Sequence, residues 1–206
     1  MAVLTRKTRE LEARRAAARG KLIEAADRLL RSDRAYADLT IEEITSHAGV
    51  SRTAFYEHFS DKRGLLAAWA SELVRPLLGE TARLSRPGPP DPDGLHRFLT
   101  SALALAREHA SLFRALFEAA TYDEVIRAYW DDLLAQFTHL VEERIERYRN
   151  QEVRPLNSKA GASVLVGAIA HACYRQVSRA TAISDEELVD ALTDVWVRAV
   201  YGTDLR

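Results

Sequence analysis

Residues 40–62, which read TIEEITSHAGVSRTAFYEHFSDK, decide the fold of this 206-residue chain. Thr40 is followed three residues later by Glu43, which is the spacing of a capping box, so a helix is expected to begin at Ile41. Gly49 can adopt the positive φ that ends a helix at little conformational cost. The first half of the stretch therefore predicts a short helix that closes on a tight turn.

A second short helix is predicted directly after that turn. Ser51 is a good N-cap, and the helix is expected to cover about residues 52–58, with Phe55 and Phe59 on the side that faces the core. Two short helices around a tight turn are typical of a helix-turn-helix, whose second helix enters the major groove of DNA. A helical hairpin whose aromatic residues serve only the core is the alternative interpretation.

The polar side chains on the outer face of the second helix suit contact with DNA. Arg52 and Thr53 stand at its N-terminal end, where recognition helices touch base edges. The free N–H groups of a helix start attract phosphate, and Tyr56, His58 and Lys62 can donate hydrogen bonds to phosphate oxygens. We therefore expect base contacts from the start of this helix and phosphate contacts from its end.

The same segment closely resembles the N-terminal domain of the TetR family of one-component repressors. The family pattern combines an apolar residue and Ser with an aromatic pair, a His-Phe step and a final Lys, and residues 50–62 read VSRTAFYEHFSDK. The resemblance implies a homodimer that binds double-stranded DNA at a palindromic operator. The residues expected to contact DNA are Thr40, Ser51, Arg52, Thr53, Ala54, Tyr56, His58 and Lys62.

Helical periodicity extends over almost the whole chain, and no stretch alternates as a strand would. The fold is predicted to be all-α, with an N-terminal three-helix helix-turn-helix domain joined by a long helix to a C-terminal antiparallel helical core. The expected boundaries are residues 1–62 for the DNA-binding domain, 63–84 for the connecting fourth helix, and 95–206 for the effector-binding and dimerisation core. Ser60 is expected to cap the connecting helix, and Pro76 within it is interpreted as a tolerated bend or as a hinge.

Charge and composition narrow the class of protein. The formal net charge of −1 excludes a basic nucleic-acid coat protein, but residues 1–21 hold seven basic and two acidic side chains. Such an arm fits phosphate or minor-groove contact, and a solvated tail is the alternative for residues 1–10. Cys173 is the single cysteine and is expected to be a buried packing residue, so no internal disulfide can form. Without an apolar run of membrane length or a signal core, the protein is expected to be cytoplasmic and to have no membrane partner.

The sequence offers little support for an enzyme. It contains no glycine-rich phosphate loop, no His pair of the metalloprotease type and no nucleophile motif. Its six histidines lack the spacing of metal ligands, and the neighbouring carboxylates Asp131 and Asp132 point to different sides of a helix. We therefore predict no catalytic residue, no metal site and no cofactor.

A small-molecule pocket is the better hypothesis for the C-terminal half. Aromatic residues recur there on inward faces, and ligand sites are mostly apolar cavities with a few polar groups, although a filled core is the alternative. Residues 124–147 and 188–202 are similar to the EthR-like members of the family, and the resemblance fades at the second-to-last helix. By this resemblance His96 stands where those proteins have an aromatic residue at the pocket mouth. The expected ligand contacts are Leu99, Leu103, Phe113, Phe117, Trp130, Leu134, Phe137 and Trp196.

The last two predicted helices differ in composition from the rest. Residues 158–178 are rich in Ala, Gly and Ser, which permits close approach of another helix, and Ser184 with Glu187 forms a capping box before the final helix. In the TetR family the two helices pair with their copies in a second subunit, although packing within one chain is the alternative. The predicted function is a TetR-type repressor released from its operator by a small hydrophobic effector. An effector-free helix-turn-helix regulator and an activator on the same fold are the alternatives.

Overall fold

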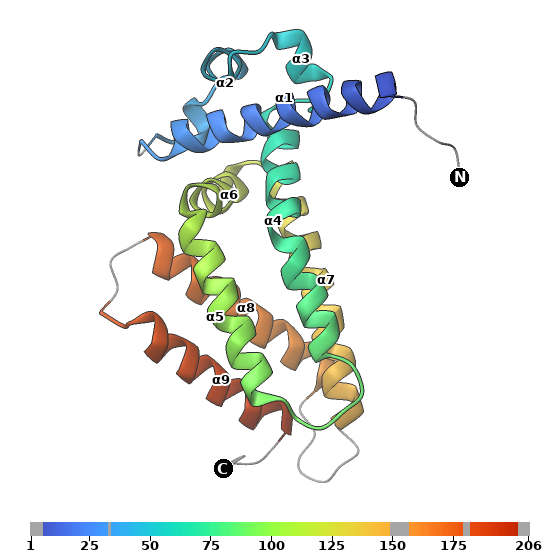
Figure 1. Ribbon diagram of the computed structural model, residues 1–206. Coiled ribbons are helices and arrows are strands. Elements are labelled where there is room, and N and C mark those ends of the chain that lie inside the picture. The colour runs from blue at the N-terminus through green and yellow to red at the C-terminus, as the bar shows by residue number, and fades with distance from the viewer. Residues whose placement is uncertain (1–5, 33, 149–156, 179–181, 202–206) are drawn as a thin grey trace.

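The computed structural model describes residues 6–32, 34–148, 157–178 and 182–201, and every regular element within these ranges is helical (Figure 1). The predicted all-α class is confirmed. The N-terminal unit consists of α1 (Arg6–Leu30), a 3-10 turn η1 (Tyr36–Asp38), α2 (Ile41–Ala48) and α3 (Arg52–Tyr56). The part of the chain that follows contains α4 (Lys62–Leu84), α5 (Pro92–Glu108), α6 (Ala110–Tyr122), α7 (Glu124–Tyr148), α8 (Ser158–Ser178) and α9 (Asp185–Tyr201).

The predicted caps at both ends of α2 form as the sequence indicates. The Glu43 N–H donates to Thr40 Oγ1 at 3.2 Å, and the Thr40 N–H donates to Glu43 Oε2 at 3.0 Å, which completes the capping box of α2. Gly49 then takes the left-handed conformation with φ 65° and ψ 35°, which only glycine adopts without strain. The turn between α2 and α3 is therefore fixed by local backbone chemistry.

The end of α3 and the start of α4 differ from the prediction. The helix ends at Tyr56 because the His58 N–H bonds the Phe55 carbonyl at 3.0 Å, a 3-10 contact that tightens the last turn. The cap of α4 is Asp61 and not Ser60, because an Asp61 carboxylate oxygen accepts from the Gly64 N–H at 2.8 Å. A carboxylate at this place is favoured by the partial positive charge of the helix start.

The helix α4 connects the two parts of the molecule. Figure 1 shows it leaving the N-terminal unit and running along the side of the C-terminal helices. It is helical throughout Lys62–Leu84 even though Pro76 lies inside it, on its exposed side.

Ser184 and Glu187 form the predicted capping box of α9, with the Glu187 N–H 3.2 Å from Ser184 Oγ. None of the described helices has both the length and the apolar character needed to cross a membrane.

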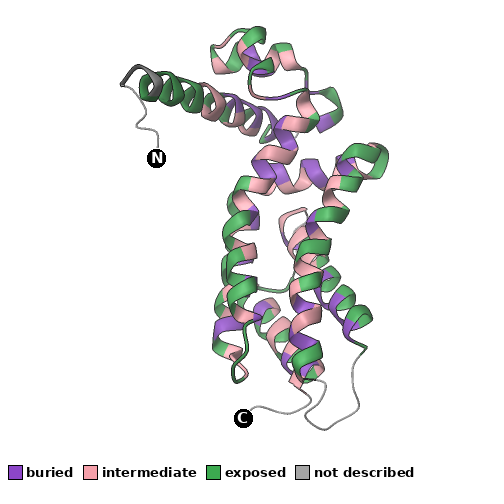
Figure 2. Cartoon of the chain, turned by 90° about the vertical axis from the view of Figure 1, so that its right-hand side faces the viewer, coloured by how far each residue is buried: buried purple, intermediate pink, exposed green. Residues whose placement is uncertain are grey.

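The largest hydrophobic core lies at the junction of the two parts. Leu22 of α1 and Leu66 of α4 pack in one buried cluster with Leu112 and Leu116 of α6. Each of these side chains is at most 1% exposed, and Figure 2 shows buried residues concentrated at this junction. One cluster therefore contains side chains from both parts, and within it α6 packs against α1 and α4.

Candidate nucleic-acid interface and core cavity

The outer face of α3 carries side chains with unused hydrogen-bonding capacity. Arg52, Thr53 and Tyr56 are exposed, and their side chains form no hydrogen bond or ion pair with any described residue. Ser51 Oγ accepts from the Ala54 N–H at 3.1 Å, so its hydroxyl hydrogen is still available. These groups gather at the start and along one side of α3, which is the arrangement expected of a helix that reads a groove.

Two buried aromatic residues, one in α3 and one just after it, hold that outer face in place. Phe55 and Phe59 are 0% and 3% exposed, and their ring centroids lie 5.5 Å apart. The guanidinium of Arg19 on α1 lies 5.4 Å from the Phe59 ring centroid and forms an ion pair with Glu72 of α4. The exposed donors of α3 are therefore supported by two long helices.

Lys62 has a different partner from the predicted phosphate. Its Nζ donates to the carbonyl oxygens of Tyr36, Ala37 and Leu39 at 3.2, 2.9 and 3.0 Å, and lies 4.8 Å from the Tyr36 ring centroid. An ammonium group has three hydrogens, and all three are used. Burial of the side chain also lowers the pKa of Lys62. The structure therefore corrects the expected role: Lys62 fixes the turn before α2 from the first residue of α4.

The hydroxyl of Thr40 is likewise used within the protein. It donates to Glu43 Oε2 at 2.7 Å, while the other carboxylate oxygen of Glu43 lies 2.7 Å from the Arg34 guanidinium. The hydrogen bonds from Arg34 and from Thr40 lower the pKa of Glu43 to about 2, so this carboxylate is ionised at neutral pH. A phosphate contact from the Thr40 hydroxyl would have to replace its bond to Glu43.

Replacing Lys62 with methionine is expected to destabilise the fold without changing the salt dependence of DNA binding. Three backbone carbonyls lose their donor, which should lower the free energy of unfolding by about 1–3 kcal/mol in urea titrations. Lys21→Met, at an exposed lysine of α1, serves as the matched control and should leave stability nearly unchanged. Unchanged stability combined with a weaker salt dependence of binding would instead restore the predicted phosphate contact.

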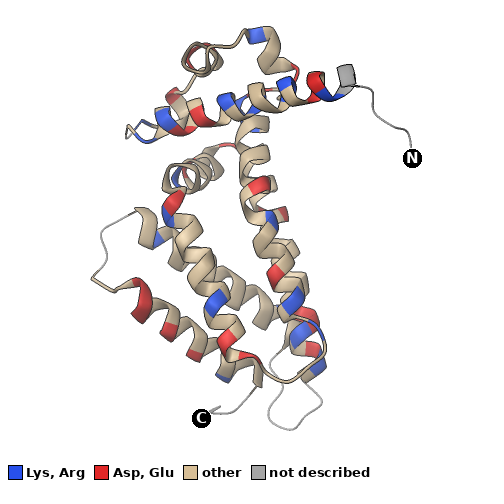
Figure 3. Ribbon diagram, viewed as in Figure 1, with Lys and Arg blue, Asp and Glu red and all other residues tan. Residues whose placement is uncertain are grey.

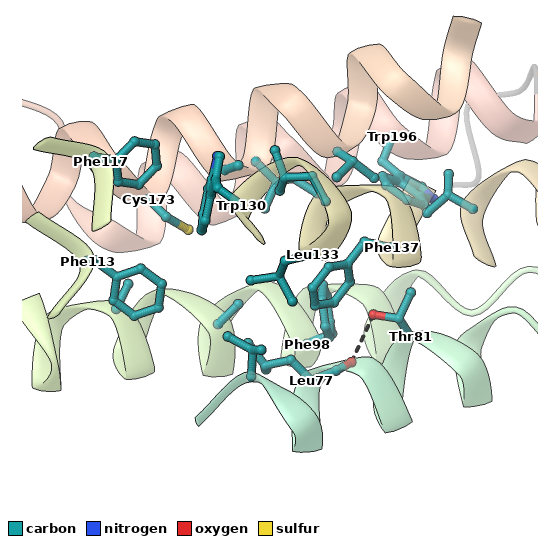
Figure 4. A pocket seen from close by; sticks show the side chains of 18 residues that line it. Leu77, Thr81, Phe98, Phe113, Phe117, Trp130, Leu133, Phe137, Cys173 and Trp196 are labelled. Carbon is teal, nitrogen blue, oxygen red and sulfur yellow. Dashed lines mark hydrogen bonds between the residues drawn. The ribbon is translucent and has the colours of Figure 1, made fainter. Parts of the chain in front are cut away.

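A cavity of about 110 Å³ lies among the helices of the C-terminal part. Phe113 and Phe117 of α6 stand at one end, and Thr81 of α4 and Trp196 of α9 stand toward the other (Figure 4). The Thr81 hydroxyl donates to the Leu77 carbonyl at 2.9 Å, so its hydrogen is not available to a ligand. The walls are therefore almost wholly apolar, as in sites for hydrocarbon-like molecules.

Six of the eight predicted ligand contacts line this cavity: Phe113, Phe117, Trp130, Leu134, Phe137 and Trp196. The other two, Leu99 and Leu103, do not line it and correct the prediction. They are 2% and 3% exposed and pack in a separate cluster with Val189 and Val197 of α9. His96 lies outside the cavity lining as well, with its Nε2 3.0 Å from Asp190 Oδ1.

None of the side chains that α4 and α5 contribute to the cavity walls was among the predicted contacts. On α5 the lining side chains are Phe98, Ala102 and Ala106. Their spacing of four residues places them on one helix face, which lies next to the face of the predicted Leu99 and Leu103. The remaining lining residues are Val74, Leu77 and Thr81 of α4, Leu133 and Val141 of α7, and Val166, Ile169, Ala170 and Cys173 of α8. Burial raises the pKa of Cys173 to about 11, so this predicted packing residue is a neutral, apolar part of the wall.

The helix α6 connects the cavity with the N-terminal unit. Phe113 and Phe117 face the cavity, whereas Leu112 and Leu116 belong to the core shared with α1 and α4. Next to its end, Asp123 pairs with Arg63 near the start of α4 at 2.6 Å. Asp123 also accepts from two N–H groups in the first turn of α7. Thus the same helix, α6, lines the cavity on one face and packs against α1 and α4 of the helix-turn-helix side on the other.

Among the described residues, no three His, Cys, Asp or Glu side chains gather as a metal site requires.

Two family models match the chain. The model for bacterial regulatory proteins of the tetR family matches residues 22–69, and the model for the C-terminal domain of the transcriptional regulator EthR matches residues 96–202.

Known proteins similar to the chain are transcriptional regulators. The HTH-type transcriptional regulator EthR of Mycolicibacterium smegmatis is 22% identical over 188 residues, which covers 88% of this chain and 85% of that protein. A regulatory protein of the tetR family from Rhodococcus RHA1 superposes with a TM-score of 0.64 at 19% identity, covering 91% of this chain and 98% of that one. The TetR family repressor AlkX from Dietzia sp., implicated in biodegradation of n-alkanes, gives a TM-score of 0.55 at 19% identity, covering 90% and 96% of the two chains.

Proposed function

The chain belongs to the TetR family of bacterial transcriptional regulators, with a C-terminal domain of the EthR type, and we propose that it is a dimeric, cytoplasmic repressor. It binds a palindromic DNA operator and is released by a small hydrophobic effector. The observation that carries this proposal is that α6 links an apolar cavity to a helix-turn-helix with unused donors on its outer face.

The proposed DNA contacts follow from the exposure of the α3 side chains. Arg52 and Thr53 contact base edges from the start of the helix, where the free N–H groups also attract phosphate. Ser51 and Tyr56 contact the phosphate backbone, and the half-buried His58 lies beside them. The proposal leaves out Lys62, because its hydrogens are bound to carbonyls within the protein.

The proposed dimer uses the exposed faces of α8 and α9. Val164 on α8 is 69% exposed and Val195 on α9 is 57% exposed, and an exposed stripe of helical spacing extends along each helix. In Figure 3 the α8 ribbon carries little charge, in agreement with its sequence, which contains no Asp or Glu. Exposed apolar surface with few charges is characteristic of interface cores, and this describes α8, whereas the exposed face of α9 also carries the carboxylates Asp190 and Asp194. A two-fold pair of such chains would present two α3 helices to half-sites about 34 Å apart.

The proposed release mechanism depends on α6. An apolar molecule between Phe113, Phe117 and Trp130 would hold α6 in a position set by the ligand, and Leu112 and Leu116 would transmit that position to α1 and α4. The effector releases DNA only if it binds better to the form whose α3 helices do not fit successive grooves. The ion pair between Arg63 and Asp123 couples the same region to the start of α4.

A footprint of the purified protein on DNA adjoining its own gene tests the proposal, and it should show a two-fold symmetric protected site. Arg52→Ala should then cost about 1–3 kcal/mol at one or two positions of each half-site and relax the base preference there. Competition binding with a panel of single-base operator variants measures this effect. A uniform loss across the panel would show that Arg52 contacts phosphate only, and the absence of any protected symmetric site would contradict the proposed function.

A further inference from the structure

A second, smaller compartment adjoins the distal end of the apolar cavity. It has a volume of about 30 Å³ and shares Thr81, Phe98, Val141 and Trp196 with the cavity. Its other walls include Arg144 of α7 and Tyr201 of α9, and we call it the Arg144 compartment. A chain-like molecule in the cavity would therefore meet a cationic group after passing Phe98 and Trp196.

Arg144 is buried, and no carboxylate in the described part of the chain pairs with it directly. It is 4% exposed, and no described Asp or Glu oxygen lies within 4.0 Å of its guanidinium nitrogens. It donates instead to the carbonyls of Arg86 and Pro89 and to the Tyr201 hydroxyl, and its Cζ lies 4.7 Å from the Tyr148 ring centroid. A buried charge normally requires an opposite charge, so this compartment favours an anion.

Two donors that could bind such an anion are still available. A guanidinium has five N–H groups, and the four hydrogen bonds of Arg144 leave one N–H on Nη1 without a partner among the described residues. The Tyr201 oxygen accepts two bonds from Arg144, and its own hydrogen has no acceptor among the described residues. Burial raises the pKa of Tyr201, so the hydroxyl keeps that hydrogen at neutral pH.

Asp91 is the one carboxylate among the described lining residues of the compartment. Its Oδ1 accepts from the Gly94 N–H at 2.7 Å, so it caps the start of α5, where the helix dipole stabilises negative charge. Its carboxylate oxygens lie more than 4.0 Å from the guanidinium nitrogens of Arg144. An incoming anion would therefore bind to Arg144 and Tyr201, with Asp91 in the same compartment as a competing negative charge that also raises the pKa of Tyr201.

We infer that the Arg144 compartment binds the carboxylate of an amphipathic effector whose hydrocarbon chain occupies the apolar cavity. The carboxylate would accept from the remaining Nη1 hydrogen of Arg144 and from the Tyr201 hydroxyl, a pair of charge-assisted bonds. The ligand class is that of medium-chain fatty acids. This inference rests on the proposed function, because it specifies the effector of the same cavity.

A purely structural role for Arg144 is the competing explanation. Arg144 holds the Arg86 and Pro89 carbonyls, and Arg147 and Tyr148 of the same helix donate to the neighbouring carbonyls of the α4–α5 connection. These contacts explain why α7 fixes that connection. They do not require the charge of Arg144 to lie beside the apolar cavity.

Decanoate and methyl decanoate distinguish the two explanations, because the ester keeps the chain and loses the charge. Titration of the intact protein, followed by calorimetry, should give decanoate an affinity about tenfold or more above that of the ester. Tyr201→Phe should remove most of this preference and leave ester binding unchanged, since the ring is kept. A structural role would weaken both probes equally.

Arg144→Met should abolish the preference, and Arg147→Met is its matched control on the same helix. Arg147 also donates to the α4–α5 connection, but it is exposed and does not line the compartment, so its variant should keep the preference. Equal affinity of the two probes, with operator release by both, would overturn this inference and leave the proposed function standing. If neither probe bound, the inference would be overturned together with the hydrophobic effector, whereas operator binding would be unaffected.

Discussion

Replacing Phe55 with alanine is expected to lower the free energy of unfolding by about 3–5 kcal/mol. Phe55 is completely buried, and its ring lies 5.5 Å from those of Tyr56 and Phe59. Its removal leaves a cavity under α3, and a helix this short has little stability of its own. Urea denaturation followed by circular dichroism measures the loss, and operator affinity should fall with it because α3 is no longer held in position.

The substitution Tyr56→Ala, at the neighbouring residue, is expected to weaken DNA binding with only a small loss of folding stability. Tyr56 is 51% exposed and packs on Phe55 only through a ring edge, so its loss should cost about 1 kcal/mol of stability. Operator affinity should nevertheless fall at every sequence tested, because a phosphate donor has been removed. If Tyr56→Ala bound all operators as the unmodified protein does, α3 would not be the DNA-contacting helix in the proposed orientation.

The features that could be predicted from sequence are those governed by neighbours three or four residues apart. Thr40 with Glu43, the positive φ of Gly49, and Ser184 with Glu187 each depend on one turn of chain. Even at this range a choice between neighbours can fail, because Asp61 and not the adjacent Ser60 caps α4. Both residue types cap helices, and only the backbone geometry decides between them.

The features that could not be predicted depend on which distant element a side chain meets. Lys62 lies at a helix start, where sequence alone indicates an exposed cation, and its carbonyl partners belong to a 3-10 turn that the sequence did not indicate. On α5 two adjacent faces are apolar, and Leu99 faces α9 while Phe98 faces the cavity. Periodicity shows that a helix is buried on more than one side but does not assign its neighbours.

The burial of the Arg144 charge could not be predicted from the sequence either. Its sequence neighbours Glu142 and Glu143 indicate an ordinary solvated helix face. Burial arises because the α4–α5 connection and Tyr201 of α9 converge on it from distant parts of the chain. Only the tertiary structure therefore places a cation at the end of an apolar cavity.

Placing a carboxylate on the exposed face of α8 is expected to separate the proposed dimer. Ala168 is exposed on that face beside Gly167, where small side chains permit close approach of a second helix. Ala168→Glu would bring a desolvated charge into the interface, near Asp190 and Asp194 on the exposed face of α9 in the proposed bundle. Light scattering at micromolar concentration should report a monomer, and operator affinity should fall about 100-fold or more because the two half-sites are no longer bound together.

Ala104→Glu provides the matched control for this experiment, since it introduces the same carboxylate at an exposed alanine of α5, outside the two stripes. Glutamate is a good helix former, so neither substitution should unfold its own helix. The control should remain dimeric and bind the operator as the unmodified protein does. A dimer that survives Ala168→Glu would move the interface to another face. A monomer that kept full operator affinity would show instead that one α3 helix is sufficient and that the palindrome is not read by symmetry.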